Sequence, residues 1–229
     1  MSKLNAFVRL DFVTVKPYLT AKNVLAYVAI ALFIALSSGS ATAMATVGMM
    51  FGMMFSTYPF ALGEKSGLDT LYAVLSLDRK RVVLGRYLYA LVLDMCVVLL
   101  MIALVLVCLP VSGLLSGAAP FEVTASEVAW MSGVIVAVLM LIESVQFPIY
   151  FKHGYSKARF LSMIPFIVLM AGSLAVSAVM KDRAIAARAA RLVDSLSSGW
   201  LAAGAALALA VMVYISYRLS LAAYTKREF

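Results

Sequence analysis

The chain has 229 residues, of which 64% are hydrophobic and only 13% are charged. A typical soluble domain is about 45–50% apolar and about 25% charged, so this composition cannot cover a surface that faces water. The excess apolar surface predicts an all-α integral membrane protein formed by a single domain over residues 1–229. Six or seven spans of about 20 residues would use the whole length, which leaves no room for a soluble catalytic domain.

Residues 1–21 have the pattern of an amphipathic helix. Arg9 and Lys16 project from the polar face, whereas Asp11 falls near the apolar face and weakens the pattern. The apolar face is formed by Leu4, Val8, Phe12, Val15 and Leu19. A basic helix of this kind is expected to lie at the level of the lipid headgroups.

Six apolar segments follow with the composition of transmembrane helices, although the first is short for a full crossing. Their expected ranges are 23–38, 41–61, 84–109, 129–150, 160–180 and 199–224. Only a Gly39-Ser40 turn joins the first two, which predicts a tight hairpin. The alternative is a single broken helix, which would give five crossings and would place the two termini on opposite sides.

The basic residues are distributed unevenly between the two sides of this arrangement. If the N-terminus is cytoplasmic, fifteen of the nineteen Lys and Arg residues fall on the inner side, as the positive-inside rule requires. Six crossings with both termini cytoplasmic are therefore expected. The net charge of +8 is then explained by anionic lipid rather than by nucleic acid.

Two further segments are expected to lie outside the bilayer. Residues 181–197 have helical spacing of apolar residues, with Arg188 and Arg191 on the opposite side, which predicts an external amphipathic segment. On the inner side, residues 62–83 contain a short helical pattern that the basic run at 79–81 is expected to end. That inner loop is either a solvated anchor for the next span or an amphipathic helix offered to a soluble partner.

Two stretches carry more specific motifs. One runs from Tyr58-Pro59-Phe60 through Glu64-Lys65 to LYAVLSLDRKRVVLGRYL at 71–88, and the other runs from Phe147 to Gly154 and on to Arg159. Together they resemble the permease subunits of ATP-binding-cassette exporters of the type-2 class, in particular the small six-span permeases associated with peptide export. Asp78 stands where that family has a proline.

The resemblance implies a transmembrane half that pairs with a second, identical or homologous half and with two copies of a cytosolic ATPase in a bacterial cytoplasmic membrane. The inner loop would dock on the ATPase through Glu64, Lys65, Leu71, Leu75, Asp78, Arg79 and Arg81. No G-x-x-x-x-G-K-[ST] loop occurs in this chain. ATP and Mg²⁺ are therefore expected on the partner, and no cofactor is expected here.

Four polar residues interrupt the predicted spans. Asp94, Glu143 and Arg218 lie about 10–12 Å from the inner side at 1.5 Å per residue, with Gln146 near the same level. They predict a polar, cytosol-facing substrate pathway in which Arg218 pairs with Asp94 or Glu143. The alternatives are a structural ion pair, or an Arg218 side chain that extends to the interface.

The second span contains Gly48-x-x-x-Gly52, continued by Ser56, and many methionines. Small residues at this spacing allow close helix approach, either at a dimer seam or within one bundle. Methionine side chains adapt to varied apolar partners, so a hydrophobic or amphipathic substrate is expected.

Two other classes of protein remain open from the sequence. An intramembrane enzyme would need a catalytic pair, for which only Asp94 and Glu143 qualify, and we assign no catalytic residue. The lone histidine, His153, has no cluster of ligands around it in the sequence, so no metal site is expected. A membrane scaffold or immunity protein that transports nothing is the other alternative.

Overall fold

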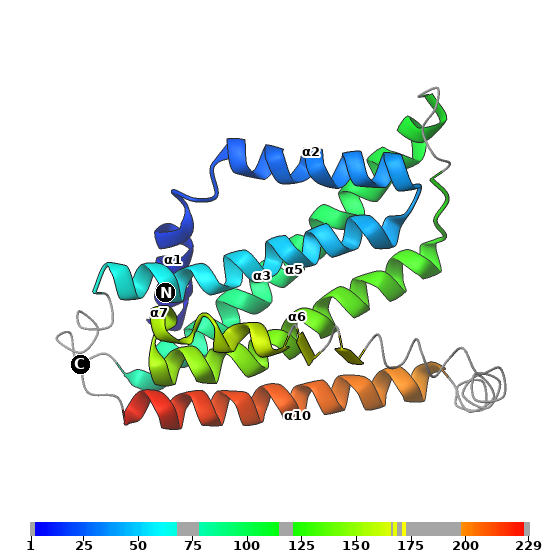
Figure 1. Ribbon diagram of the computed structural model, residues 1–229. Coiled ribbons are helices and arrows are strands. Elements are labelled where there is room, and N and C mark those ends of the chain that lie inside the picture. Colours follow the sequence, from blue (N-terminus) through cyan, green and yellow to red (C-terminus); the bar gives the residue numbers. More distant parts are fainter. Residues whose placement is uncertain are drawn as a thin grey trace.

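The computed structural model describes residues 3–67, 78–114, 121–165, 167–168, 171–172 and 198–226, and every regular element in those ranges is a helix (Figure 1). The elements are α1 (Lys3–Val15), α2 (Ala21–Ser38), α3 (Ala41–Lys65), α5 (Arg79–Leu114), α6 (Ala125–His153), α7 (Tyr155–Ala158), the 3₁₀ helix η1 (Leu161–Met163) and α10 (Ser198–Thr225).

Five of these helices, α2, α3, α5, α6 and α10, are long and apolar enough to cross a membrane. They coincide with five of the six predicted spans and confirm an all-helical, multi-pass membrane protein. The remaining predicted span, 160–180, lies mostly outside the described residues. The predicted external segment 181–197 lies entirely outside them.

The α2–α3 turn is built by a glycine and a serine. Gly39 adopts a left-handed φ of 64°, which favours glycine, and its N–H donates to the carbonyl of Ala35 to close α2. The Ser40 side chain then accepts from the Ala43 N–H and caps α3. The Tyr27 ring lies 4.5 Å from the Phe51 ring across the hairpin. The hairpin prediction is therefore confirmed over the single broken helix.

The helices around α3 form the centre of the bundle. An added Cβ at Gly48 would lie 2.8 Å from Met101 Sδ, and one at Gly52 would lie 3.0 Å from Leu139 Cδ1. The helices α5 and α6 therefore approach α3 closely because these two positions lack side chains.

The helices α6 and α10 run in the same direction. Ser144 of α6 contacts Ser216 of α10, and further along both helices the Phe151 and Tyr224 rings lie 5.3 Å apart.

Helix α1 is shorter than the amphipathic segment predicted over 1–21, and Figure 1 shows it running across the ends of the long helices. Val15 is fully buried, and the Phe12 ring lies 4.7 Å from the Tyr89 ring of α5. Asp11, which weakens the predicted amphipathic pattern, is also buried on this packed face.

The basic run at 79–81 forms the first turn of α5, and the short loop helix that the sequence predicts before it lies outside the described residues. The Asp78 carboxylate accepts a hydrogen bond from the Lys80 N–H at 3.0 Å, which satisfies one of the free donors at the start of α5. Asp78 therefore serves as the start of α5.

Candidate functional site

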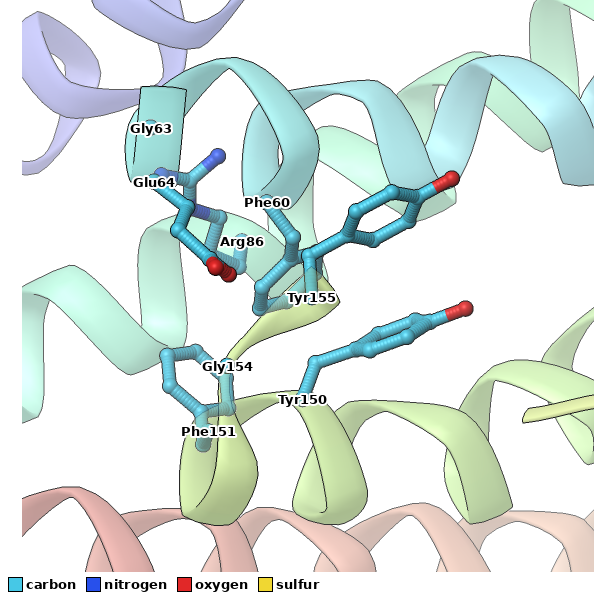
Figure 2. A pocket seen from close by; sticks show the side chains of 8 residues that line it. All are labelled: Phe60, Gly63, Glu64, Arg86, Tyr150, Phe151, Gly154 and Tyr155. Carbon is cyan, nitrogen blue, oxygen red and sulfur yellow. The ribbon is translucent and has the colours of Figure 1, made fainter. Parts of the chain in front are cut away.

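The two family-like motifs, although far apart in sequence, meet at one end of the bundle. A small pocket there is lined from α3, α5, α6 and α7 (Figure 2). Its lining residues are Phe60, Gly63, Glu64, Arg86, Tyr150, Phe151, Gly154 and Tyr155. We call these eight residues the inner junction. The sequence predicted both motifs but not their contact.

Phe60 is the aromatic centre of the inner junction. Its ring centroid lies 5.0 Å from Phe147 and 5.2 Å from Tyr150. The Phe151 ring approaches at 5.0 Å, edge to face. Aromatic pairs at such distances each contribute about 0.5–1.5 kcal/mol beyond the area they bury. The end of α3 is thereby fixed against the last turns of α6.

A buried ion pair connects the inner junction to α1. The Arg86 Nη1 atom lies 3.1 Å from the Asp11 Oδ1 atom, and both side chains are almost fully buried. The Arg86 guanidinium also stacks over the Phe60 ring at 5.0 Å. An added Cβ at Gly63 would lie 3.2 Å from Arg86 Nη2, so glycine leaves space for the arginine. Sequence reasoning missed this pair because the two residues are far apart in the chain.

Glu64 joins the end of α3 to the start of α7. Its Oε2 atom accepts a hydrogen bond from the Ser156 N–H at 3.1 Å. Figure 2 shows its side chain beside Arg86 at the pocket. Lys65, the next predicted coupling residue, is exposed at the end of α3.

Arg79 closes the C-terminal end of α10. Its Nη1 atom donates to the carbonyl oxygens of Tyr224 and Thr225, at 3.2 and 2.5 Å. These carbonyls have no partner within the helix, and a cation there also opposes the negative end of the helix dipole. Arg81 by contrast forms only an exposed pair with Asp78, at 3.8 Å. The predicted coupling residues Leu71 and Leu75 lie outside the described residues.

The polar residues within the spans are only partly brought together. Asp94, Glu143 and Gln146 are buried, and the two carboxyl groups are close enough to interact electrostatically. Arg218 is exposed instead, and its Nη1 atom donates to the Tyr214 hydroxyl at 3.1 Å. The predicted pairing of Arg218 with a carboxylate was therefore wrong, because Arg218 projects from the outer face of α10. Nor does the structure open the three buried side chains to the cytosol as the pathway prediction expected.

A hydroxyl network that the sequence did not reveal lies at the same level. The Tyr87 hydroxyl is 2.6 Å from Ser216 Oγ and 2.8 Å from Ser220 Oγ. Ser216 Oγ in turn donates to the Ser144 carbonyl at 2.6 Å. The serines are spaced four residues apart on α10, which was the available sign that they share a face. The network ties α5, α6 and α10 together beside the inner junction.

The Gly48, Gly52 and Ser56 stripe faces the interior of the bundle. Side chains of α5 and α6 cover both glycines, and Ser56 is buried. The contacts therefore agree with close packing within one bundle. Because α5 and α6 cover the stripe, it is not available for contact with a second copy of the chain.

The family described as "ABC-2 family transporter protein" matches residues 7–225. No curated protein and no solved structure matches the chain significantly. The match includes both motifs of the inner junction and all five long helices. The chain therefore belongs to the ABC-2 transporter family, as a membrane-embedded permease component and not a catalytic subunit.

Proposed function

We propose that this chain is the permease subunit of an ATP-driven exporter in a bacterial cytoplasmic membrane. The observation that carries the proposal is the family match over almost the whole chain. The exported molecule would be a hydrophobic or amphipathic peptide or a lipid-like molecule, which suits the many methionines of α3. ATP and Mg²⁺ would bind to a separate cytosolic ATPase present in two copies.

The inner loop between α3 and α5 is the proposed docking element for the ATPase. Both of its ends are fixed to the rest of the bundle by polar contacts. Glu64 ties the end of α3 to α7, Arg79 ties the start of α5 to α10, and Arg86 ties α5 to α1. A displacement of this loop by closing ATPases would therefore move several helices together.

We further propose six crossings with both termini on the cytosolic side. The parallel directions of α6 and α10 support this count, because two parallel spans require a return crossing between them. The ends of α3, α6 and α10 then lie on the side where α5 begins (Figure 1). The excess of Lys and Arg assigns that side to the cytosol.

A second permease half, identical or homologous, completes the proposed transporter. The apolar faces of α2 and α10 support this, since Phe33 and Trp200 are 72% and 79% exposed. These faces contact either lipid or the other half. A substrate-pathway role for Asp94, Glu143, Gln146 and Arg218 stays a prediction, and it would require the bundle to open.

Gentle purification from the native membrane tests the proposal. We expect the chain to carry an ATPase with it and to lose that ATPase in a Leu71→Asp, Leu75→Asp variant. Leu114→Asp is the matched control, because Leu114 is exposed at the opposite end of α5. Wild-type protein without any ATPase would contradict the proposal and favour a scaffold or immunity protein. So would equal retention of the ATPase in both variants.

A further inference from the structure

Asp94 of α5 and Glu143 of α6 form a buried pair of acids within the spans. Asp94 is 0% exposed and Glu143 is 5% exposed. Asp94 lies eight residues beyond Arg86, or about 12 Å along α5, so the pair is inside the apolar layer and not at its edge. Both carboxyl oxygens of Asp94 and the Oε1 atom of Glu143 are buried in this arrangement of the helices.

The pair has no neutralising cation among the described residues. Arg86 is the one basic side chain buried in the described ranges, and it is already paired with Asp11. Neither oxygen of Asp94 has a hydrogen-bond partner, and neither does Glu143 Oε1.

In the part of the chain that the structure describes, the other groups that face the pair are uncharged or already paired. Ser56 of α3 lies within hydrogen-bonding reach of Glu143, and the phenols of Tyr87 and Tyr89 on α5 also interact with it. The Tyr89 phenol also interacts electrostatically with both members of the Asp11–Arg86 pair.

The described residues of the remaining elements add no charge. On α10, Ser216 and Ser220 face Tyr87, while Arg218 is exposed. Gln146, one turn beyond Glu143, donates from Nε2 to the Ser162 carbonyl at 2.8 Å, and its Oε1 atom has no partner.

Two ionised carboxylates without a cation are not stable in such a position. Burying one unpaired charge costs several kcal/mol, and a second like charge nearby adds direct repulsion. The neutral form of a carboxyl group removes both penalties, and it also supplies an O–H donor for the oxygens that have none. Because the described residues supply no cation, this arrangement favours a bound positive charge, of which a proton is the smallest.

We propose that Asp94 and Glu143 form a proton-binding site that is occupied while the bundle is closed. When α5 and α6 separate and water enters, the carboxyl O–H bond breaks, the proton passes to water, and the carboxylate keeps the electron pair. This opening step rests on the proposed transport function, whereas occupancy of the closed site does not. Transport would then be accompanied by release and uptake of a proton at this pair.

Infrared spectroscopy of the purified chain in neutral-lipid nanodiscs tests the occupied site without ATPase, nucleotide or substrate. We expect the carbonyl band of a protonated carboxyl group at neutral pH. The band should disappear in the Asp94→Asn, Glu143→Gln double variant and remain in a Glu122→Gln, Glu127→Gln control, whose carboxyls are exposed. Should the double variant fail to fold, the Asp94→Asn and Glu143→Gln single variants assign the band, which should be reduced or lost in at least one of them.

Stability against pH provides the second measurement. A folded state that binds more protons than the unfolded state loses stability as pH rises, so the wild-type melting temperature should fall toward alkaline pH and the double variant should show a flatter profile. Absence of the band at neutral pH would overturn the proposal. So would its persistence in the double variant, or its loss on adding Na⁺, which would assign a metal cation instead. The band in a chain without an ATPase partner would leave this site standing while the proposed function fails.

Discussion

The inner junction and the opposite end of the bundle are held together by different kinds of contact. At the inner end, α1, α3, α5, α7 and α10 are joined by the Arg86–Asp11 pair, the Glu64 bond and the Arg79 bonds. At the outer end, the α2–α3 turn and the start of α6 border an open cleft lined by Ser40, Glu127 and Trp130, among others. The bundle is thus joined by buried and helix-end polar contacts at one end and borders an open cleft at the other.

Breaking the buried Arg86–Asp11 ion pair is expected to have the largest effect on stability. Arg86→Met removes the guanidinium that pairs with the buried Asp11 carboxylate and should lower the free energy of unfolding by about 3–5 kcal/mol. Denaturation in mixed micelles measures this, and the Arg86→Met, Asp11→Asn double variant should recover most of the loss. An unchanged midpoint in the single variant would show that the pair does not stabilise the inner end.

Removing the aromatic centre is expected to have the next largest effect. Phe60→Ala deletes a ring in contact with three others and should cost about 3 kcal/mol. Phe33→Ala is the matched control, because the Phe33 side chain is exposed on α2 and should change stability by less than about 0.5 kcal/mol. Equal losses of stability in the two variants would mean that the inner junction is no more tightly packed than the exposed face of α2.

The glycines offer a smaller and more local test. Gly52→Ala places a methyl group 3.0 Å from Leu139 and should cost about 1–3 kcal/mol. Gly204→Ala on α10 meets no atom within 4 Å and should stabilise the helix by about 0.5–1 kcal/mol. Thermal melting of the two variants should therefore shift in opposite directions, and a shift of the same sign in both would contradict the packing of α3.

The smallest expected effect concerns the two arginines at the start of α5. Arg79→Ala removes the bonds that close α10 and should cost about 1 kcal/mol. Arg81→Ala removes only an exposed pair and should cost less than about 0.5 kcal/mol. Hydrogen exchange of the last α10 amides should rise in the first variant alone. Equal exchange in both would mean that Arg79 does not hold the end of that helix.

The positions of the long helices were predictable because hydropathy records their apolar middles directly. The ends were less so: α5 begins at Arg79 and not at residue 84, since charged residues can continue a helix into the interface. The start of α6 was readable in principle, because Thr124 and Glu127 form a capping box. Contacts between helices could not be read in this way. Asp11 appeared as a flaw in an amphipathic pattern until α5 supplied Arg86, and Arg218 faces outward although its depth matches that of Glu143.

The contact between Arg79 and the end of α10 also sets an order for biogenesis. Helix α5 leaves the ribosome well before α10, so the Arg79 guanidinium and the Tyr87 hydroxyl remain without these partners until α10 arrives. Until then, water or other parts of the chain must satisfy these polar groups, so the start of α5 reaches its final contacts only after α10 has docked.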